Sequence, residues 1–160
     1  MSSKKKGKSS SDAAATNPNA RRSYEIIETF EAGMVLTGSE VKSLRQGRAS
    51  LREAYAVVRD GEIFLQGMHI PQYAQAGYSQ HEPTRPRKLL LKKEEIRRLS
   101  AKTAEKGLTL VPLKCYFTHG LAKLELGLGR GKKLFDKRQD LKTRDHARQV
   151  DRALADKRRR

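Results

Sequence analysis

The sequence predicts a mainly β protein with short helices: an OB-like antiparallel barrel with two to three helices and a basic C-terminal tail that is disordered or helical. Short β-branched and aromatic runs alternate with turn signals, of which Asp60-Gly61 is the strongest. Two helix patterns interrupt these runs, and 160 residues suffice for one domain with a modest core. A small sheet removes its exposed edges by curling into a barrel, a class that commonly binds nucleic acid.

The positive charge is concentrated at the two ends of the chain. Lys and Arg number 35 against 18 Asp and Glu, which gives a formal net charge of +17. Residues 1–23 have a net charge of +5 and residues 131–160 of +7, so these 53 residues hold +12 of the total. The charge indicates a polyanionic partner, and its layout favours a folded body with two basic arms over a compact enzyme.

The N-terminal segment lacks the pattern of a folded element. Residues 1–16 contain Ser, Lys, Ala and Gly without apolar periodicity, which predicts a disordered basic tail. A turn signal at 17–19 is followed by a strand pattern over 24–30, which is β-branched and aromatic. The folded OB-like body is expected to cover residues 17–130.

The next segment predicts one helix and one hairpin. Thr37 and Glu40 have the spacing of a capping box that begins a helix, and Gly47 is well placed to end it. Residues 51–58 and 62–66 flank the hairpin turn as two strands. A long polar loop follows before the next apolar run.

The second half of the body predicts a helix and then a clear hairpin. Residues 92–106 have acids early and bases late on a helical apolar spacing, and Gly107 ends the pattern. Residues 108–117 and 121–128 alternate in the manner of half-buried strands. The buried sides are expected to contain Val111, Leu113, Cys115 and Phe117 of the first strand and Leu124, Leu126 and Leu128 of the second.

A glycine-rich stretch joins the body to the C-terminal arm. Gly127, Gly129 and Gly131 permit a close backbone approach and predict a hinge, although a plain glycine-rich strand end has the same pattern. Residues 136–154 contain helix formers without Pro or Gly, and Arg144, Arg148 and Arg152 form a basic stripe. Because isolated helices of this length are marginal in water, we expect an arm that becomes helical against a polyanion. A permanently solvated tail is the alternative.

The sequence contains no pattern for a catalytic or metal site. Cys115 is the only cysteine and lies in an apolar run, and the four histidines lack metal-binding spacing. No apolar run is long enough to cross a bilayer. We expect no catalytic residue, no metal, no cofactor, no membrane partner and a cytoplasmic location.

Several motifs together resemble the small protein B family, the SsrA-binding proteins of bacteria. They occur in the family's order and cover about residues 17–155. The matching stretches are Phe30-Glu31-Ala32-Gly33, Gly38-Ser39-Glu40-Val41-Lys42-Ser43-Leu44-Arg45, Asp60-Gly61-Glu62, Met68-His69-Ile70, Pro83-Thr84-Arg85-Pro86-Arg87-Lys88-Leu89-Leu90-Leu91, Leu108-Thr109-Leu110-Val111-Pro112-Leu113, and Gly131-Lys132-Lys133 through Asp136-Lys137-Arg138.

The resemblance implies a non-enzymatic RNA-binding adaptor. Such a protein binds the tRNA-like part of transfer-messenger RNA and delivers it to stalled ribosomes for trans-translation, the process of ribosome rescue and peptide tagging. The implied ribosomal contacts are 16S rRNA, the decoding centre and the mRNA channel, with elongation factor Tu involved indirectly through the charged RNA. The protein itself is expected to be a monomer, with residues 131–160 helical on the ribosome.

The resemblance also implies which residues make these contacts. Positions for transfer-messenger RNA are matched by Asn17, Arg21, Glu31, Leu91, Lys123 and Gly131. We assign to the ribosome-binding tail Lys132, Lys133, Phe135, Asp136, Lys137, Arg138, Arg144, Arg148 and Arg152. Residues 136–138 match the piece that reports to the decoding centre, and Phe135 matches a position for stacking on a ribosomal base. One departure is that Pro18 and Asn19 replace basic residues of the family, which removes charge beside Asn17.

Simpler structural roles exist for three of these residues. Glu31 has the position of an acid at a strand end, Leu91 that of a core residue, and Asp136 that of a helix N-cap. Lys123 lies on the wet side of its strand, which favours a phosphate contact.

Two other classes of function compete with the adaptor. A structural ribosomal protein with a basic tail would purify at one copy per subunit whether or not ribosomes stall. A basic-tailed enzyme acting on RNA would need clustered carboxylates, a His pair or a metal site, whereas the acids here fall on helix starts, turns and strand faces. The RNA that copurifies with the protein separates the adaptor from both.

Overall fold

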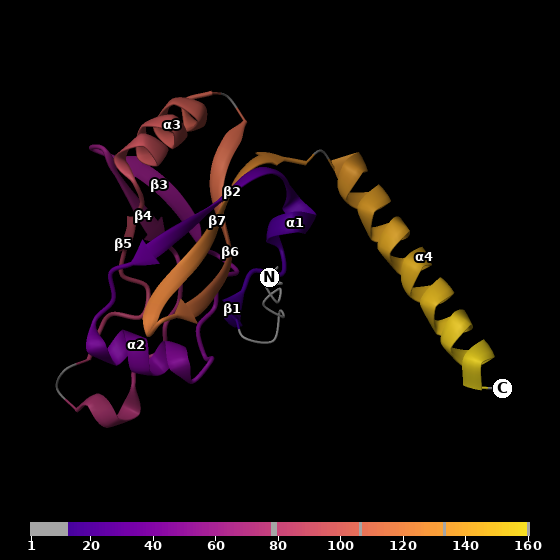
Figure 1. Ribbon diagram of the computed structural model, residues 1–160, viewed down its shortest axis with the longest axis horizontal. Helices are drawn as coiled ribbons and strands as arrows, with labels where there is room; N and C mark the ends of the chain where they lie inside the picture. The colour runs from indigo at the N-terminus through magenta and orange to yellow at the C-terminus, as the bar shows by residue number, and fades with distance from the viewer. Residues whose placement is uncertain (1–12, 78–79, 106, 133, 160) are drawn as a thin grey trace, which may run out of the picture.

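The computed structural model describes residues 13–77, 80–105, 107–132 and 134–159. Among these residues a curled antiparallel sheet is surrounded by short helices, and one long helix extends away from it (Figure 1). The strands are β1 (Ala13–Thr16), β2 (Tyr24–Met34), β3 (Tyr55–Arg59), β4 (Glu62–Gln66), β5 (Arg87–Leu90), β6 (Leu108–Thr118) and β7 (Leu121–Gly131). The helices are α1 (Ala20–Ser23), α2 (Gly38–Arg45), α3 (Lys93–Thr103) and α4 (Leu134–Arg159), with a 3-10 turn η2 at Ala74–Ala76.

The sheet closes into a ring. Its order is β1-β6-β3-β4-β5-β2-β7, and β7 pairs again with β6, so the strands from β2 to β7 form a barrel to which β1 adds on β6. The β2–β7 and β6–β7 ladders are long, whereas β3 meets β6 at the single pair Ala56–Leu110. The predicted antiparallel barrel is confirmed.

The barrel interior is filled by alternate side chains of its strands. Leu124, Leu126 and Leu128 of β7 are fully buried, which confirms the predicted alternation on this strand. Helices α2 and α3 cover opposite ends of the barrel (Figure 1). Each inserts a fully buried leucine into the core, Leu44 from α2 and Leu99 from α3.

The prediction that Val111, Leu113, Cys115 and Phe117 lie on one side of β6 is wrong, although the first three are buried. The pairing with β7 shifts between Pro112 and Lys114, a β-bulge that reverses the alternation along the strand. Cys115 is therefore buried in the barrel core, and the half-buried Phe117 packs against that core. Val111 and Leu113 instead form a second apolar cluster outside the barrel, together with Ala20, Tyr24 and Ile26.

Local turn and cap signals are reproduced in the structure. The Thr37–Glu40 capping box is present, with Thr37 N donating to Glu40 Oε1 at 3.2 Å. Asp60 and Gly61 have φ values of 51° and 74°, as the hairpin turn requires. Gly47 follows α2 with a φ of 71°. Helix α3 ends at Thr103, earlier than predicted.

The N-terminal prediction is wrong for four residues. Ala13–Thr16 form β1, which pairs with residues 114–116 of β6, whereas residues 1–12 lie outside the described part of the chain. The physical reason is an available edge: β3 covers β6 only at residue 110, so the rest of that edge can accept a strand of small residues. Helix α1, which was not predicted, follows at once.

The glycines near the C-terminus belong to β7 rather than to a hinge. A Cβ atom on Gly127 would lie 3.2 Å from Ile26, and one on Gly129 would lie 3.1 Å from Tyr24. These two glycines therefore make room for the outer apolar cluster. A Cβ on Gly131 would meet no atom within 4 Å, so packing does not require a glycine there.

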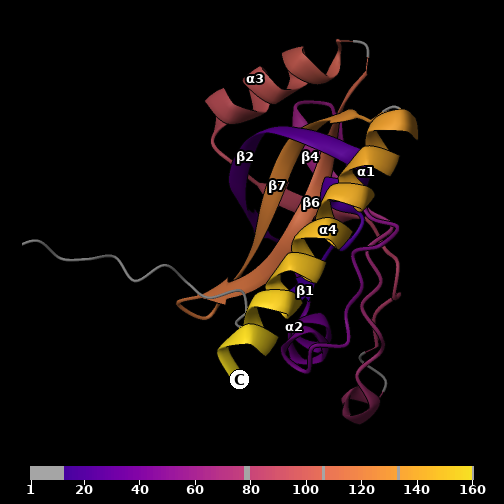
Figure 2. The ribbon, with the colours of Figure 1, turned by 90° about the vertical axis from the view of Figure 1, so that its right-hand side faces the viewer.

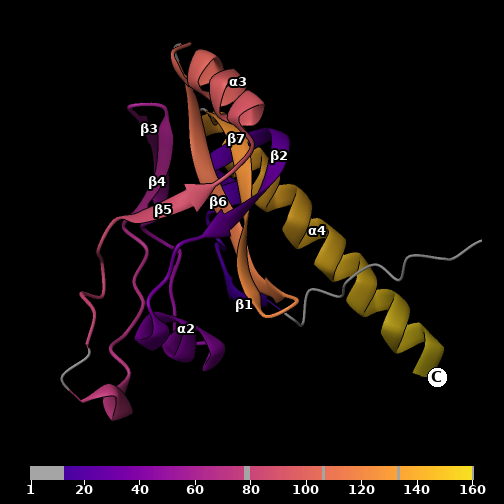
Figure 3. The ribbon, with the colours of Figure 1, turned by 60° about the vertical axis from the view of Figure 1, so that its left-hand side comes forward.

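Helix α4 is longer than predicted and leaves the barrel. It begins at Leu134, two residues before the predicted start, and reaches Arg159. Asp136 thus lies in the first helical turn and not at the N-cap. Figures 2 and 3 show α4 running along the α1 side of the barrel and away from it, and the side chains described from residue 138 onward are exposed.

Candidate RNA interface

Four neighbouring strands carry a row of residues in register on their outer side. Leu90 of β5 pairs with Gly33 of β2, Gly33 with Lys123 of β7, and Lys123 with Tyr116 of β6. Their neighbours along the strands are buried: Ala32, Leu89, Cys115, Ala122 and Leu124. The row therefore points away from the core. We call these four residues, together with Glu31, the outer patch.

A second row beside the first contains three charges. Glu31 of β2 pairs with Glu125 of β7, and Glu125 pairs with Lys114 of β6. The Lys114 Nζ lies 3.6 Å from the Glu125 Oε2, so Lys114 compensates the charge of Glu125. Because carboxylates directly opposite each other on antiparallel strands repel, Glu31 needs a partner elsewhere.

Tyr116 supplies that partner. Its hydroxyl reaches from β6 over β7 and donates a hydrogen bond to the Oε2 of Glu31. Burial raises the pKa of Tyr116 above its ordinary value of 10, and the hydrogen bond to Glu31 and the charges of Glu31 and Glu125 raise it further. Glu31 is thus an exposed carboxylate held at a fixed position.

Lys123 is the cation of the outer patch. It is half-buried, on the side of β7 predicted to be wet, and has no ion-pair partner among the residues that the structure describes. Its ammonium is therefore available for an anionic group such as a phosphate.

The apolar member of the outer patch is Leu90, the neighbour of Leu91, which the resemblance implied as a contact. Leu90 is 52% exposed, while Leu91 is half-buried and packs against the barrel core. Leu89 is buried, and because side chains alternate along β5, Leu90 must point outward. The structure brings Glu31 and Lys123 to the same outer side of the barrel and leaves Leu91 half-buried against the core.

Asn17 and Gly131 lie in a second region, an open hollow of ≈ 610 Å³ between α1 and the β3–β6 contact. Asn17 Nδ2 donates to Pro112 O at 3.0 Å, and its Oδ1 accepts from Asn19 N at 3.1 Å. The Asn17 amide therefore holds the turn before α1. Gly131 leaves open space at the edge of the same hollow.

Arg21 and Lys132 connect this region to the tail. Arg21 is exposed on α1, and its backbone oxygen accepts a hydrogen bond from Lys132 Nζ at 3.0 Å. Lys132 N also donates to Ser23 O at 2.9 Å. Arg21 and Lys132 line a smaller hollow of ≈ 380 Å³ that includes Thr143 and Arg144 of α4.

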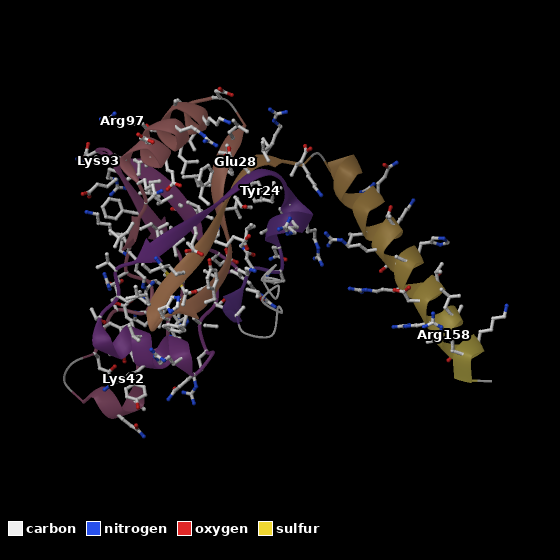
Figure 4. All side chains as sticks on the ribbon, viewed as in Figure 1. Tyr24, Glu28, Lys42, Lys93, Arg97 and Arg158 are labelled. Carbon is white, nitrogen blue, oxygen red and sulfur yellow. The ribbon has the colours of Figure 1, made fainter. Side chains whose placement is uncertain are left out.

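The predicted tail residues lie on or before α4. Arg138, Arg144, Arg148 and Arg152 are exposed. Lys133 lies outside the described residues, as do the side chains of residues 135–137. Sticks project from several sides of α4 in Figure 4, which labels Arg158 near the end of the helix.

Sequence reasoning missed a buried charge cluster that anchors the long loop. Glu40 and Arg87 are both fully buried and form an ion pair, and Arg85 Nε donates to Glu40 Oε1 at 2.7 Å. Arg87 also donates to Met68 O at 2.7 Å and to Pro83 O at 3.0 Å. The cluster binds the loop to α2, at the barrel end marked by Lys42 in Figure 4, and it is structural.

The sequence did not reveal the role of Tyr116, because that role depends on the pairing of strands. Tyr116 is two residues from Lys114 and one from the apolar Cys115, so its position on the outer side follows from alternation along the strand. Its bond to Glu31 depends on the register of three strands, which a single sequence does not show.

Neither a metal-binding cluster nor a membrane-crossing helix is found in the described ranges. No three His, Cys, Asp or Glu side chains among those residues come together in a way that could hold a metal ion. The long helix α4 is rich in charged residues, and none of the described helices is apolar enough over a sufficient length to cross a bilayer.

Comparisons with known proteins agree on one family. The family model described as "SmpB protein" matches residues 14–156. The SsrA-binding protein of Salinispora arenicola is 59% identical over 139 residues, 87% of each chain, and that of Acidothermus cellulolyticus is 59% identical over 140 residues, 88% of each. The SsrA-binding protein of Halalkalibacterium halodurans is 52% identical over 153 residues, covering 96% of this chain and 99% of the relative.

A solved structure agrees with these relatives. It is described as "tmRNA-SmpB: a journey to the center of the bacterial ribosome", and the match has a TM-score of 0.63 at 52% identity. It covers 74% of this chain and 84% of the other chain. With the family model matched over most of its length, the chain belongs to the SmpB protein family.

Proposed function

We propose that this protein is an RNA-binding adaptor that binds transfer-messenger RNA and delivers it to stalled ribosomes for trans-translation. The observation that carries the proposal is the outer patch: a held carboxylate, a cation without an ion-pair partner in the described chain and an exposed leucine lie on one side of a barrel. The names of the relatives and of the solved structure support the choice of RNA and of the ribosome.

Each group of the outer patch fits a different part of an RNA. Lys123 fits a backbone phosphate, which positions the RNA without reading its sequence. The Leu90 side chain offers an apolar surface to a base or sugar. Glu31 repels phosphate but accepts hydrogen bonds from a base edge or a 2′-hydroxyl. It therefore disfavours an RNA backbone phosphate at this position and favours an RNA loop with exposed donors.

The tail fits a second task in the same proposal. Helix α4 contains 26 residues, and at ~1.5 Å per residue it is ~39 Å long. With its exposed arginines it can follow rRNA from the barrel into an empty mRNA channel, and residues 136–138 would report to the decoding centre. A channel filled by message would exclude the helix, so the tail would sense stalling.

This proposal assigns residues 17–130 to binding of transfer-messenger RNA and residues 131–160 to the ribosome. The protein acts as a monomer, contacts 16S rRNA, and meets elongation factor Tu only through the charged RNA. It acts in the cytoplasm, where ribosomes translate. It performs no chemical step.

The test is to identify the RNA that copurifies with the protein from bacterial cells. One dominant RNA with a tRNA-like end, enriched over rRNA, is the expected result. Broad rRNA at one copy per subunit would instead identify a structural ribosomal protein. Incubation of the purified protein with this RNA, with and without Mg²⁺, should leave the RNA intact, and specific cleavage would overturn the adaptor.

A further inference from the structure

We propose that Tyr116 is a positioning residue for RNA recognition: its hydroxyl fixes the Glu31 carboxylate so that one oxygen, Oε1, faces a single N–H or O–H donor of the RNA. The inference rests on the proposed function, because it concerns the chemistry of the same outer patch.

The first step is that Glu31 would not stay in place alone. It is exposed on β2, and its cross-strand neighbour Glu125 carries the same charge. Lys114 lies beside Glu125 and not beside Glu31, so the repulsion on Glu31 is not compensated within its own row. A free glutamate side chain also samples many rotamers, and ordering it on binding is unfavourable.

The second step is that Tyr116 removes this freedom. Its half-buried ring lies on β6 with the Lys114 ammonium 5.8 Å from the ring centroid, which helps to fix the ring. From there the hydroxyl crosses β7 and reaches the Glu31 Oε2. A tyrosine hydroxyl is protonated at neutral pH already at its ordinary pKa of about 10, so Tyr116 acts as the donor in this bond.

The third step concerns what remains for the RNA. With Oε2 engaged, Oε1 accepts no hydrogen bond from the residues that the structure describes. A carboxylate with both oxygens free could accept hydrogen bonds from two adjacent donors, as on the edge of guanine. Glu31 instead offers one well-placed acceptor, which suits a lone amino group of a base or a 2′-hydroxyl.

The experiment measures binding of the tRNA-like domain of transfer-messenger RNA to the full chain and its variants. Tyr116→Phe removes only the hydroxyl and should weaken binding about tenfold, the effect of one hydrogen bond to a charged group. The slope of log K against log salt should stay unchanged, because no phosphate contact is lost. Tyr73→Phe is the matched control: it removes an exposed hydroxyl, bonded to Gln75 at 2.7 Å, outside the outer patch, and should bind normally.

A double-mutant cycle tests whether Tyr116 acts through Glu31. In a Glu31→Ala background, Tyr116→Phe should cause no further loss of affinity. Glu31→Gln should lose as much as Glu31→Ala, because Tyr116 would hold the amide oxygen and turn the amide N–H groups toward the RNA donor. Equal loss from Tyr116→Phe with and without Glu31 would mean that Tyr116 contacts RNA itself, and unchanged binding of Tyr116→Phe would also overturn the inference.

Two further comparisons distinguish a failure of the proposed function from a failure of this inference, and identify the donor group of the RNA. If the wild-type protein does not bind the RNA, the proposed function fails; if it binds and loses affinity with Glu31→Ala but not with Tyr116→Phe, only the present inference fails. RNA with 2′-deoxy sugars in its loops identifies the donor. A Glu31 effect that vanishes on this RNA assigns the donor to a 2′-hydroxyl, and one that persists assigns it to an amino group.

Discussion

At the scale of single residues, the fold depends on a charged pair that no solvent reaches. Burial alone would raise the pKa of Glu40, but the hydrogen bonds from Arg87 and then Arg85, with the charge of Arg87, hold the pKa below its ordinary value of 4.5. The carboxylate also caps α2 through Thr37 N. Glu40 therefore joins a helix start, a strand and a long loop.

Removal of one partner of this pair should be costly. Glu40→Ala leaves the Arg87 guanidinium buried without compensation and should lower the free energy of unfolding by about 3–5 kcal/mol. Glu62→Ala is the control, because Glu62 forms an exposed pair with Lys88 at 2.7 Å and should cost less than about 1 kcal/mol. Urea denaturation at neutral pH measures both, and equal losses would contradict the role of the buried pair.

The same pair predicts a dependence of stability on pH. Since the pKa of Glu40 is lower in the folded state, its contribution is complete above about pH 4.5 and is lost as the pH falls through the folded-state pKa. Urea titrations from neutral to acid pH should show this loss in the wild-type protein. The loss of stability at acid pH should be smaller in Glu40→Gln. Identical pH profiles of the two proteins would show that Glu40 does not cause the loss.

The outer patch makes a residue-scale prediction about two neighbouring leucines, Leu90 and Leu91. Leu90→Ala should weaken RNA binding several-fold with little change in stability, because Leu90 is exposed. Leu91→Ala should mainly lower stability, since Leu91 packs on the core. Gel shifts measure RNA binding of the two variants, and urea denaturation measures their stability. Weaker RNA binding by Leu91→Ala than by Leu90→Ala would show that Leu91 makes the RNA contact.

At the scale of elements, the features predicted correctly are those that depend on near neighbours. The capping box of α2, the Asp60-Gly61 turn and the alternation of β7 each follow from residues a few positions apart. The strand Ala13–Thr16 depends on partners about one hundred residues away in β6. Beyond the bulge in β6, Val111 and Leu113 pack against Ala20, Tyr24 and Ile26, which are also far away in the sequence. Local patterns do not encode such partners.

The candidate site divides in the same way. Alternation placed Lys123 on the wet side of β7, and the resemblance to a family supplied Glu31. The resemblance supplied Leu91, whereas alternation about the buried Leu89 places its neighbour Leu90 on the outer side of β5. The bond between Tyr116 and Glu31 crosses three strands, so only the folded register reveals it.

At the scale of the whole molecule, the body and the tail are joined by a short, well-anchored segment. Gly131 still pairs with Tyr24 in the barrel, and Lys132 donates to Ser23 O and Arg21 O. The barrel therefore continues to residue 132, and α4 begins two residues later. A cut after Lys132 separates the two parts without removing any barrel strand.

Truncation after Lys132 should separate RNA binding from tagging. The barrel should fold and bind the tRNA-like RNA with a shallower salt slope, because basic residues of the tail no longer displace counterions. Productive tagging on stalled ribosomes should be lost, because nothing reaches the mRNA channel. Loss of folding, measured by circular dichroism, would show that the tail stabilises the barrel.

A narrower change tests residues 136–138 while it keeps the length of the arm. The triple variant Asp136→Ala, Lys137→Ala, Arg138→Ala removes one negative and two positive charges, and alanine favours the helix. Its matched control is Asp156→Ala, Lys157→Ala, Arg158→Ala, the same change of charge at the far end of α4. We expect near-normal RNA binding for both variants and failed tagging in reconstituted translation for the first alone. Equal tagging by the two variants would place the contact with the decoding centre elsewhere on α4, and loss of RNA binding by the first would assign residues 136–138 to transfer-messenger RNA instead.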